Sequence, residues 1–168
     1  MPVTEVIAYI GLGSNLQDPR SQVSRALQAL DHLPRTRCTA RSSLYSSPPL
    51  GPPDQPEYVN AVACLATGLA APELLHALLA VEQTHGRVRN GTRWGPRTLD
   101  LDILTYGDAC IDSPELRIPH PGIPERAFVL YPLAEIAPAD LEIRGLGLLA
   151  DSLRRCPRGE LKRLGGDA

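Results

Sequence analysis

Aromatic side chains and excess positive charge are both scarce in this 168-residue sequence. Phe, Trp and Tyr make up 4% of the residues, and the formal net charge at pH 7 is −2. Modules that bind single-stranded RNA usually offer stacking aromatic side chains and a basic surface. A nucleic acid or an anionic membrane surface is therefore not the expected partner.

Clustered cysteines and long apolar runs are missing as well. The four cysteines, Cys38, Cys64, Cys110 and Cys156, form no C-x-x-C pair, so we expect reduced and mostly buried thiols. No apolar run approaches the length of a membrane span, and the start, MPVTEVIAYIG, lacks the basic region of a signal peptide. We expect a cytoplasmic protein without a membrane partner.

The length and the hydrophobic content are those of an ordinary globular domain. Hydrophobic residues make up 43% of the chain, which allows a sizeable core. We expect one domain over residues 1–168, working as a monomer, with a loose polar tail from Gly159.

The segment 99–106 has the alternation of a strand. Asp100 and Asp102 alternate with Leu99, Leu101 and Ile103, so both carboxylates point to one face and the apolar side chains to the other. Two strand residues of one face lie roughly 6.6 Å apart. A single D-x-D is a weak signal, but paired carboxylates suit Mg²⁺, which takes oxygen ligands and shares them with substrate phosphates.

The preceding loop, 86–98, is strongly basic. It carries Arg87, Arg89, Arg93 and Arg97 together with Trp94, and it has no acidic residue. Arginine-rich loops are often only solvated surface, yet guanidinium groups also match polyphosphate oxygens. Joined to the aspartate strand without a gap, the loop predicts a site for a magnesium nucleotide.

The first strand, expected over 3–12, ends in GLGSNL. The glycines imitate a dinucleotide-binding fingerprint, but Leu16 stands where its third glycine belongs. We therefore interpret GLGSNL as a strand-to-helix turn, in which Ser14 and Asn15 satisfy backbone groups.

The remaining elements follow from periodicity and from proline and glycine signals. We expect helices from Asp18 to before Pro34, from Pro72 to before Gly86, from about Pro124, and over 146–154; strands over 38–45, 58–67 and 110–111; and a proline-rich loop over 46–56. This order predicts an α+β, ferredoxin-like sandwich, in which helices pack on a mainly antiparallel sheet.

The strand 58–67 carries a second candidate surface. Val59 and Ala61 belong to one face, whereas Tyr58 and Asn60 share the other. That polar face is either the wet side of the sheet or the lining of a pocket for a flat, hydrogen-bonding heterocycle.

Five motifs together resemble the 6-hydroxymethyl-7,8-dihydropterin pyrophosphokinases of folate biosynthesis. They are GLGSNL, SPPLGPPDQPEYVNA, Glu82 with GRVR, RWGPRTLDLDI and IPHPGIPERAFVL, and they occur in that family's order over residues 8–136. The resemblance implies a ferredoxin-like fold. It also implies transfer of the β,γ-pyrophosphoryl group of ATP to the pterin hydroxymethyl oxygen, with release of AMP.

The resemblance implies a site as well. Asp100 and Asp102 are expected to hold two Mg²⁺ ions and to act in catalysis with Arg87 and Arg97. ATP is expected to contact Glu82, Arg87, Arg89, Arg93, Trp94, Arg97, Ile103, Arg117, His120 and Arg126. The pterin is expected to contact Ser47, Pro48, Leu50, Tyr58, Asn60, Trp94, Asp100 and Phe128.

Some positions depart from the family pattern or leave alternatives open. Glu115 stands where some relatives carry a basic residue, and Arg117 and Leu79 replace small or polar residues near the nucleotide. His120, flanked by prolines, is a turn residue on its sequence context alone. Another Mg-dependent phosphotransferase or nucleotidyltransferase is the rival enzyme, and an RNA-binding module on the same fold is the rival from another class.

Overall fold

The computed structural model describes residues 5–15, 18–47, 58–84 and 99–164. Its elements in chain order are β1 (Val6–Ser14), α1 (Pro19–Leu30), β2 (Thr36–Arg41), β3 (Tyr45–Ser47), β4 (Tyr58–Thr67), α2 (Ala71–Thr84), β5 (Asp100–Tyr106), β6 (Ile111–Asp112), β7 (Arg117–Ile118), the 3₁₀ turn η1 (Ile123–Glu125), α3 (Ala127–Ile136), β8 (Glu142–Ile143), β9 (Gly147–Leu148), α4 (Leu149–Arg155) and β10 (Lys162–Arg163).

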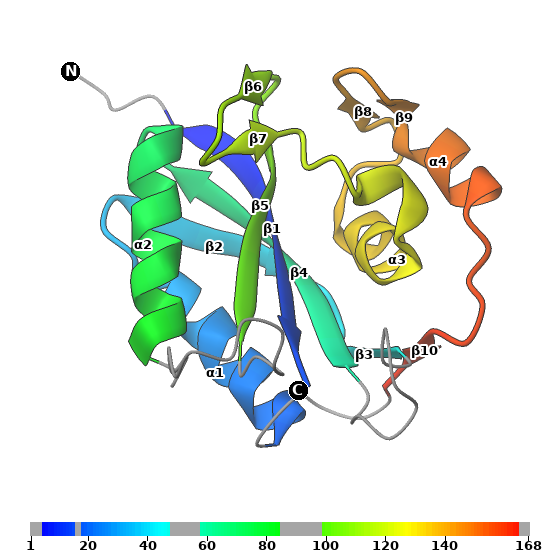
Figure 1. Ribbon diagram of the computed structural model, residues 1–168, viewed down its shortest axis with the longest axis horizontal. Coiled ribbons are helices and arrows are strands. Elements are labelled where there is room, and N and C mark those ends of the chain that lie inside the picture. The colour runs from blue at the N-terminus through cyan, green and yellow to red at the C-terminus, as the bar shows by residue number, and fades with distance from the viewer. Residues whose placement is uncertain (1–4, 16–17, 48–57, 85–98, 165–168) are drawn as a thin grey trace.

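One antiparallel sheet organises these elements (Figure 1). Its strand order is β10-β3-β4-β1-β5, and β2 pairs with the far half of β4, next to β3 along the same edge. The ferredoxin-like α+β prediction is therefore confirmed. The strand expected over 38–45 is in fact two strands, because β2 ends at Arg41 and β3 begins at Tyr45.

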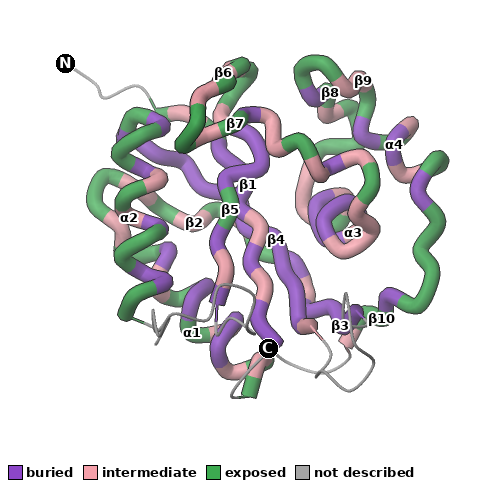
Figure 2. Tube along the Cα trace, in the orientation of Figure 1, coloured by how far each residue is buried: buried purple, intermediate pink, exposed green. Residues whose placement is uncertain are grey.

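Two apolar cores lie on opposite faces of the sheet (Figures 1 and 2). The first holds Val23 and Leu27 of α1 with Leu74 and Leu78 of α2. The second holds Leu130 of α3 with residues from α4 and from the outer face of the strands. Because β4 is covered on both faces, it is buried from Val59 to Thr67.

The start of α1 and the bounds of strand β4 agree closely with the sequence. The predicted N-cap Asp18 accepts a hydrogen bond from the Ser21 amide at 3.5 Å, and Pro19 occupies the first helical turn. The strand predicted over 58–67 is observed with those bounds. Among the described helices, none is long and apolar enough to cross a membrane.

Three local expectations are wrong. The residues GLGS belong to β1 itself, which runs on to Ser14, so they are not a turn. The helix expected over 146–154 begins only at Leu149, because Gly147 and Leu148 form β9. The tail is ordered as far as residue 164, since β10 pairs with β3.

A register shift in β5 changes which residues face α3. Ile10 pairs with Ile103 and Tyr9 with Thr105, so Leu104 is the extra residue of a bulge. Leu104 keeps the alternation of Asp100 and Asp102 and joins the α3-side core. The bulge brings the next residue, Thr105, to the same face, in register with Tyr9. The Leu104 carbonyl accepts a hydrogen bond from the His120 amide at 2.9 Å, which fastens the segment after β7 to β5.

Candidate active site

The floor of the candidate site crosses three neighbouring strands. In the register of the sheet, Gly13 of β1 lies between Asn60 of β4 and Asp100 of β5, and Gly11 lies beside Asp102. Residues in register share a face. The pattern therefore places an amide, two backbone surfaces without side chains and two carboxylates on one face of the sheet.

The predicted alternation along β5 is confirmed. Leu99, Leu101 and Ile103 all belong to the core beneath α1 and α2. Asp100 and Asp102 point the other way, with Asp102 exposed and Asp100 partly buried. Both carboxylates line one cavity.

That cavity has a volume of about 170 Å³ and lies between the sheet and the start of α3. The residues that line it come from β1, β3, β4, β5, the segment after β7 and α3: Gly11, Leu12, Gly13, Ser47, Tyr58, Asn60, Ala61, Asp100, Asp102, Leu104, His120, Arg126, Phe128 and Val129. Eight of these were predicted from the sequence as site residues: Ser47, Tyr58, Asn60, Asp100, Asp102, His120, Arg126 and Phe128.

Gly11 and Gly13 were missed because their role depends on strand pairing. A Cβ atom at Gly13 would lie 3.0 Å from Asn60 Oδ1, and one at Gly11 would lie 3.3 Å from Leu104 Cδ2. Side chains at these positions would fill the floor of the cavity. Glycine at alternate positions within a strand was the signal available in the sequence, since it indicates close approach of another group.

Asn60 is fixed by its neighbour in β3. Its Nδ2 donates a hydrogen bond to Ser47 Oγ at 2.8 Å, and both residues are buried. This bond directs the amide nitrogen towards β3, so the carboxamide oxygen lies over Gly13. Buried polar groups that have a partner hold their orientation, which suits recognition of a ligand by hydrogen bonds.

His120 is a turn residue whose side chain also reaches the cavity. Its Nδ1 accepts a hydrogen bond from the Gly122 amide at 3.0 Å, as a turn residue does, and its side chain also lines the cavity. An accepting Nδ1 places the proton of the neutral ring on Nε2. Burial lowers the pKa of His120 below its ordinary value, Arg126 lowers it further, and Asp102 opposes both. The ring is thus a neutral hydrogen-bond donor near pH 7.

Arg126 and Phe128 form the α3 side of the cavity. The guanidinium carbon of Arg126 lies 5.7 Å from the centroid of the Phe128 ring, within the range of a cation–π contact. A Cβ at Gly122 would lie 2.6 Å from Arg126 Nε, so glycine at that position leaves room for the arginine. A positive group and an aromatic face thus stand across from the two carboxylates.

Three predicted nucleotide residues do not line this cavity. Glu82 is 3% exposed and its Oε2 accepts a hydrogen bond from the Leu101 amide at 2.7 Å, on the side of the sheet covered by α2. The Ile103 side chain is buried in the same core. Arg117 is exposed on β7 and forms an ion pair with Asp112 at 3.5 Å.

The other predicted residues lie outside the described part of the chain. They are Pro48 and Leu50 in segment 48–57, and Arg87, Arg89, Arg93, Trp94 and Arg97 in segment 85–98. The described chain lines the cavity on both sides of the first segment, at Ser47 and Tyr58, and shortly after the second, at Asp100.

A larger cavity, of about 530 Å³, lies at the other end of the same face. It is lined by Ile7, Tyr9 and Cys64 of the sheet and by the chain around β8, and none of the predicted site residues lines it. Volume therefore does not locate the chemistry, whereas converging carboxylate, amide, imidazole and guanidinium groups do.

The donor set suits a hard cation. Within the described residues, no group of three or more His, Cys, Asp or Glu side chains converges as a metal site. Two carboxylates with open space beside them match the way proteins hold Mg²⁺, which keeps several waters and takes the remaining oxygens from a substrate. Asp100 and Asp102 are the described residues that fit this role.

The sequence and the fold were then compared with known proteins. The profile of the 7,8-dihydro-6-hydroxymethylpterin-pyrophosphokinase family (HPPK) matches residues 9–138. The 2-amino-4-hydroxy-6-hydroxymethyldihydropteridine pyrophosphokinase of Pseudomonas aeruginosa is 53% identical over 158 residues, covering 94% of this chain and 96% of the relative. The enzyme of that name from Haemophilus influenzae is 47% identical over 150 residues, covering 89% and 92%.

The fold has solved counterparts. A crystal structure of Plasmodium falciparum HPPK-DHPS with pterin and p-hydroxybenzoate superposes with a TM-score of 0.71 at 12% identity, over 92% of this chain. This chain spans 43% of that longer protein, so this likeness concerns the fold alone. On the profile match and the close relatives together, this chain belongs to the 7,8-dihydro-6-hydroxymethylpterin-pyrophosphokinase family.

Proposed function

We propose that this chain transfers the pyrophosphoryl group of ATP to the hydroxymethyl group of 6-hydroxymethyl-7,8-dihydropterin and releases AMP, as a step of folate biosynthesis. The observation that carries the proposal is the meeting of two different half-sites in one cavity. Asp100 and Asp102 offer ligands for a cation–phosphate complex, while Tyr58, Asn60 and Phe128 offer the faces and the amide that suit a pterin. A site for ATP alone would not need the aromatic faces and the amide, and a site for the pterin alone would not need the paired carboxylates.

The pterin half-site is built for a flat amide-like ring. We propose that the ring lies between Tyr58 and Phe128, and that Asn60 reads its hydrogen-bonding edge from the floor of the cavity. The bond from Asn60 to Ser47 holds that amide before the ligand arrives, which lowers the cost of ordering on binding. Backbone groups of Pro48 and Leu50 are proposed to complete this half.

The nucleotide half-site is built around charge. We propose that Asp100 and Asp102 hold two Mg²⁺ ions, and that His120 and Arg126 contact the phosphates or the ribose from the opposite wall. Bound Mg²⁺ would neutralise phosphate charge and lower the pKa of the attacking hydroxyl. Arg87, Arg89, Arg93, Trp94 and Arg97 are proposed to complete the phosphate site. Glu82 and Ile103 are buried behind the sheet and Arg117 pairs with Asp112, so these three are not assigned a contact with the nucleotide in this cavity.

The chemistry demands positioning more than covalent help. The hydroxymethyl oxygen attacks the β-phosphorus, the bond from that phosphorus to the oxygen of AMP breaks, and the hydroxyl proton is lost. Asp102 is exposed to the cavity, so we propose that it orients the hydroxyl and assists removal of its proton. The neutral Nε2–H of His120 donates to phosphate oxygen without adding a titrating charge near pH 7.

Product analysis tests the proposal. Purified protein is incubated with ATP, Mg²⁺ and the hydroxymethyl dihydropterin, and the nucleotide products are separated. AMP is expected. ADP would indicate a simple kinase, and free pyrophosphate would indicate a nucleotidyltransferase; either product would overturn the proposal.

We further propose a monomeric, single-domain, cytoplasmic enzyme that does not bind nucleic acid. The net charge of −2 and the low aromatic content support the last point. Retention of single-stranded RNA in a filter-binding assay would contradict it.

A further inference from the structure

A surface carboxylate outside the cavity joins three separate segments. Glu135, near the end of α3, accepts hydrogen bonds at Oε2 from the Ser43 amide and the Ser43 hydroxyl, both at 2.9 Å. Its Oε1 accepts a hydrogen bond from the Tyr45 hydroxyl at 2.7 Å, and Oε2 lies 3.7 Å from the Arg163 guanidinium. Both oxygens of one carboxylate are therefore engaged.

These partners hold strand β3 from both sides. Tyr45 begins β3, and Arg163 of β10 pairs with Tyr45 in the sheet. Arg163 Nε also donates to Ser43 Oγ at 3.0 Å, and the Leu164 amide donates to the Leu44 carbonyl at 2.8 Å. The short strand β3 is thus held by its pairing with β4 and, at its start, also by α3 and β10.

The same two elements form opposite walls of the candidate site. Ser47, two residues after Tyr45, lines the cavity and orients Asn60. Phe128, seven residues or about two helical turns before Glu135, lines the other wall. A tie between Glu135 and the start of β3 therefore sets the distance between the walls that we assign to the pterin.

We propose that Glu135 is a positioning residue for the pterin, acting through β3 and α3 without touching either substrate. This inference rests on the proposed function, because it assigns the width of the pterin half-site to the Glu135 tie. Charged acceptors strengthen hydrogen bonds, and the Tyr45 hydroxyl, in a side chain only 6% exposed, is costly to leave without its partner.

The ionisation of the pair agrees with the geometry. Burial raises the pKa of Tyr45 to about 12, and the hydrogen bond to Glu135 adds to that rise. Burial acts to raise the pKa of Glu135, but the bonds from Tyr45 and Ser43 outweigh it and leave this pKa below its ordinary value. Near pH 7 the neutral hydroxyl of Tyr45 thus donates its hydrogen bond to an ionised Glu135 carboxylate.

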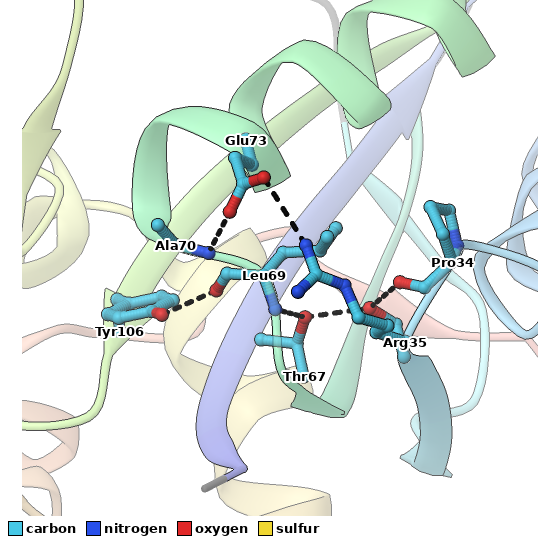
Figure 3. A network of polar contacts seen from close by, with 8 residues as sticks. Pro34, Arg35, Thr67, Leu69, Ala70, Glu73 and Tyr106 are labelled. Carbon is cyan, nitrogen blue, oxygen red and sulfur yellow. Dashed lines mark hydrogen bonds and ion pairs between the residues drawn. The ribbon is translucent and has the colours of Figure 1, made fainter. Parts of the chain in front are cut away.

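The network of polar contacts around Glu73 offers a control (Figure 3). Glu73 of α2 also accepts a backbone hydrogen bond, from the Ala70 amide at 2.9 Å, and also meets an arginine, Arg35 at 3.3 Å. Neither Glu73 nor its partners line the candidate site. Glu73→Gln thus removes a similar charge from a similar network that does not touch β3.

The test is calorimetric binding of the hydroxymethyl dihydropterin in the presence of Mg²⁺ and a non-hydrolysable ATP analogue. Wild-type protein is measured first; absence of pterin binding there would remove the proposed function itself. In Glu135→Gln we expect the pterin Kd to rise about 10-fold, as loss of one charge-assisted bond predicts. The Kd of the ATP analogue, measured alone, is expected to change less than about twofold.

Tyr45→Phe removes the donor and keeps the ring, so it gives the same readout if Glu135→Gln does not fold. It is expected to weaken pterin binding in the same direction, while Glu73→Gln leaves the pterin Kd at the wild-type value. A pterin Kd that is unchanged in Glu135→Gln or Tyr45→Phe, or that rises equally in Glu73→Gln, would overturn the proposal.

Discussion

At the scale of single residues, the candidate site depends on which side chains are present and on which are absent. Asp100 and Asp102 supply charge to the cavity, whereas Gly11 and Gly13 keep its floor open between the carboxylates and Asn60. Mutations of the two kinds of residue are expected to impair the site in different ways. Removing a carboxylate changes the chemistry, and adding a methyl group changes the shape.

Asp102→Asn is expected to lower turnover by about 10²- to 10³-fold, by analogy with other charge-stabilising groups. The substitution keeps the shape and removes the charge. Asp102 is exposed, so the midpoint of thermal unfolding should stay close to the wild-type value. AMP formation and thermal unfolding are measured together, with Asp112→Asn on exposed β6 as the control. Wild-type turnover in Asp102→Asn would remove this residue from the mechanism.

Gly13→Ala is expected to weaken pterin binding by about 10-fold, because its Cβ would lie 3.0 Å from Asn60 Oδ1 and the amide must move. Gly11→Ala meets only the end of the flexible Leu104 side chain, at 3.3 Å, and should have a smaller effect. Pterin titrations of the two variants make the comparison. Equal affinities in both would show that Asn60 is not displaced.

At the scale of elements, the site is held by ties between a strand and the helix behind or above it. Glu82 of α2 accepts from the Leu101 amide, between the two aspartates of β5, and Glu135 of α3 accepts from the start of β3. Each tie joins a helix to a strand that carries site residues. Helices α2 and α3 therefore also help to fix the positions of the strands that carry the site residues.

Glu82→Ala is expected to lower the free energy of unfolding by about 1–3 kcal/mol, because the buried Leu101 amide loses its acceptor. Turnover should fall as well, since both neighbours of Leu101 are the carboxylates that we assign to the metal site. Chemical denaturation and AMP formation are the measurements. Glu82→Gln retains an acceptor oxygen and should recover most of the stability; equal losses in both variants would contradict the role of the hydrogen bond.

The Glu135 tie predicts a dependence of stability on pH. The pKa of Glu135 is lower in the folded protein than its ordinary value of 4.5. Its contribution is therefore complete above that value and is lost as the pH falls through the lower, folded pKa. The difference in unfolding free energy between wild type and Glu135→Gln should be constant above about pH 5 and shrink in acid. A difference that grows in acid would contradict the sign.

At the scale of the whole molecule, the site that we propose for both substrates lies where the sheet faces α3, and the two faces of the sheet differ in what covers them. The face under α1 and α2 is a continuous apolar core. The other face is divided between the core under α3, the candidate site and the larger cavity near β8. Binding at the candidate site thus bridges the sheet and α3, and should stabilise the whole fold.

Saturating ligands are expected to raise Tm by about 5–10 °C, since a ligand at 100 times its Kd adds about 2.7 kcal/mol and each kcal/mol corresponds to about 2–4 °C in a chain of this size. Scanning calorimetry with the non-hydrolysable ATP analogue, Mg²⁺ and pterin makes the measurement. Excess EDTA should remove the part of the rise that is due to the nucleotide. An equal rise with EDTA present would contradict a cation held by Asp100 and Asp102.

Local sequence was sufficient wherever the structure repeats a simple period. The alternation in 58–67 and 99–103 predicted which side chains face the core, and Asp18-Pro19 predicted the start of α1. Eight site residues that line the cavity were identified from motifs that resemble a family. The split of 38–45 into β2 and β3 was missed, because pairing with two parts of β4, and not the local composition, decides it.

The sequence by itself determined most of the longer elements, the faces of β4 and β5, and the family, because periodicity and motif order are properties of the chain. Only the tertiary structure decided that GLGS is a floor and not a turn, since strand pairing on both sides keeps the backbone extended to Ser14. It alone placed Glu82 and Ile103 behind the sheet, brought His120 beside β5 and tied Glu135 to β3. These arrangements join residues that are far apart in the chain. Such contacts produce no periodic pattern in the local sequence, so the sequence alone does not predict them.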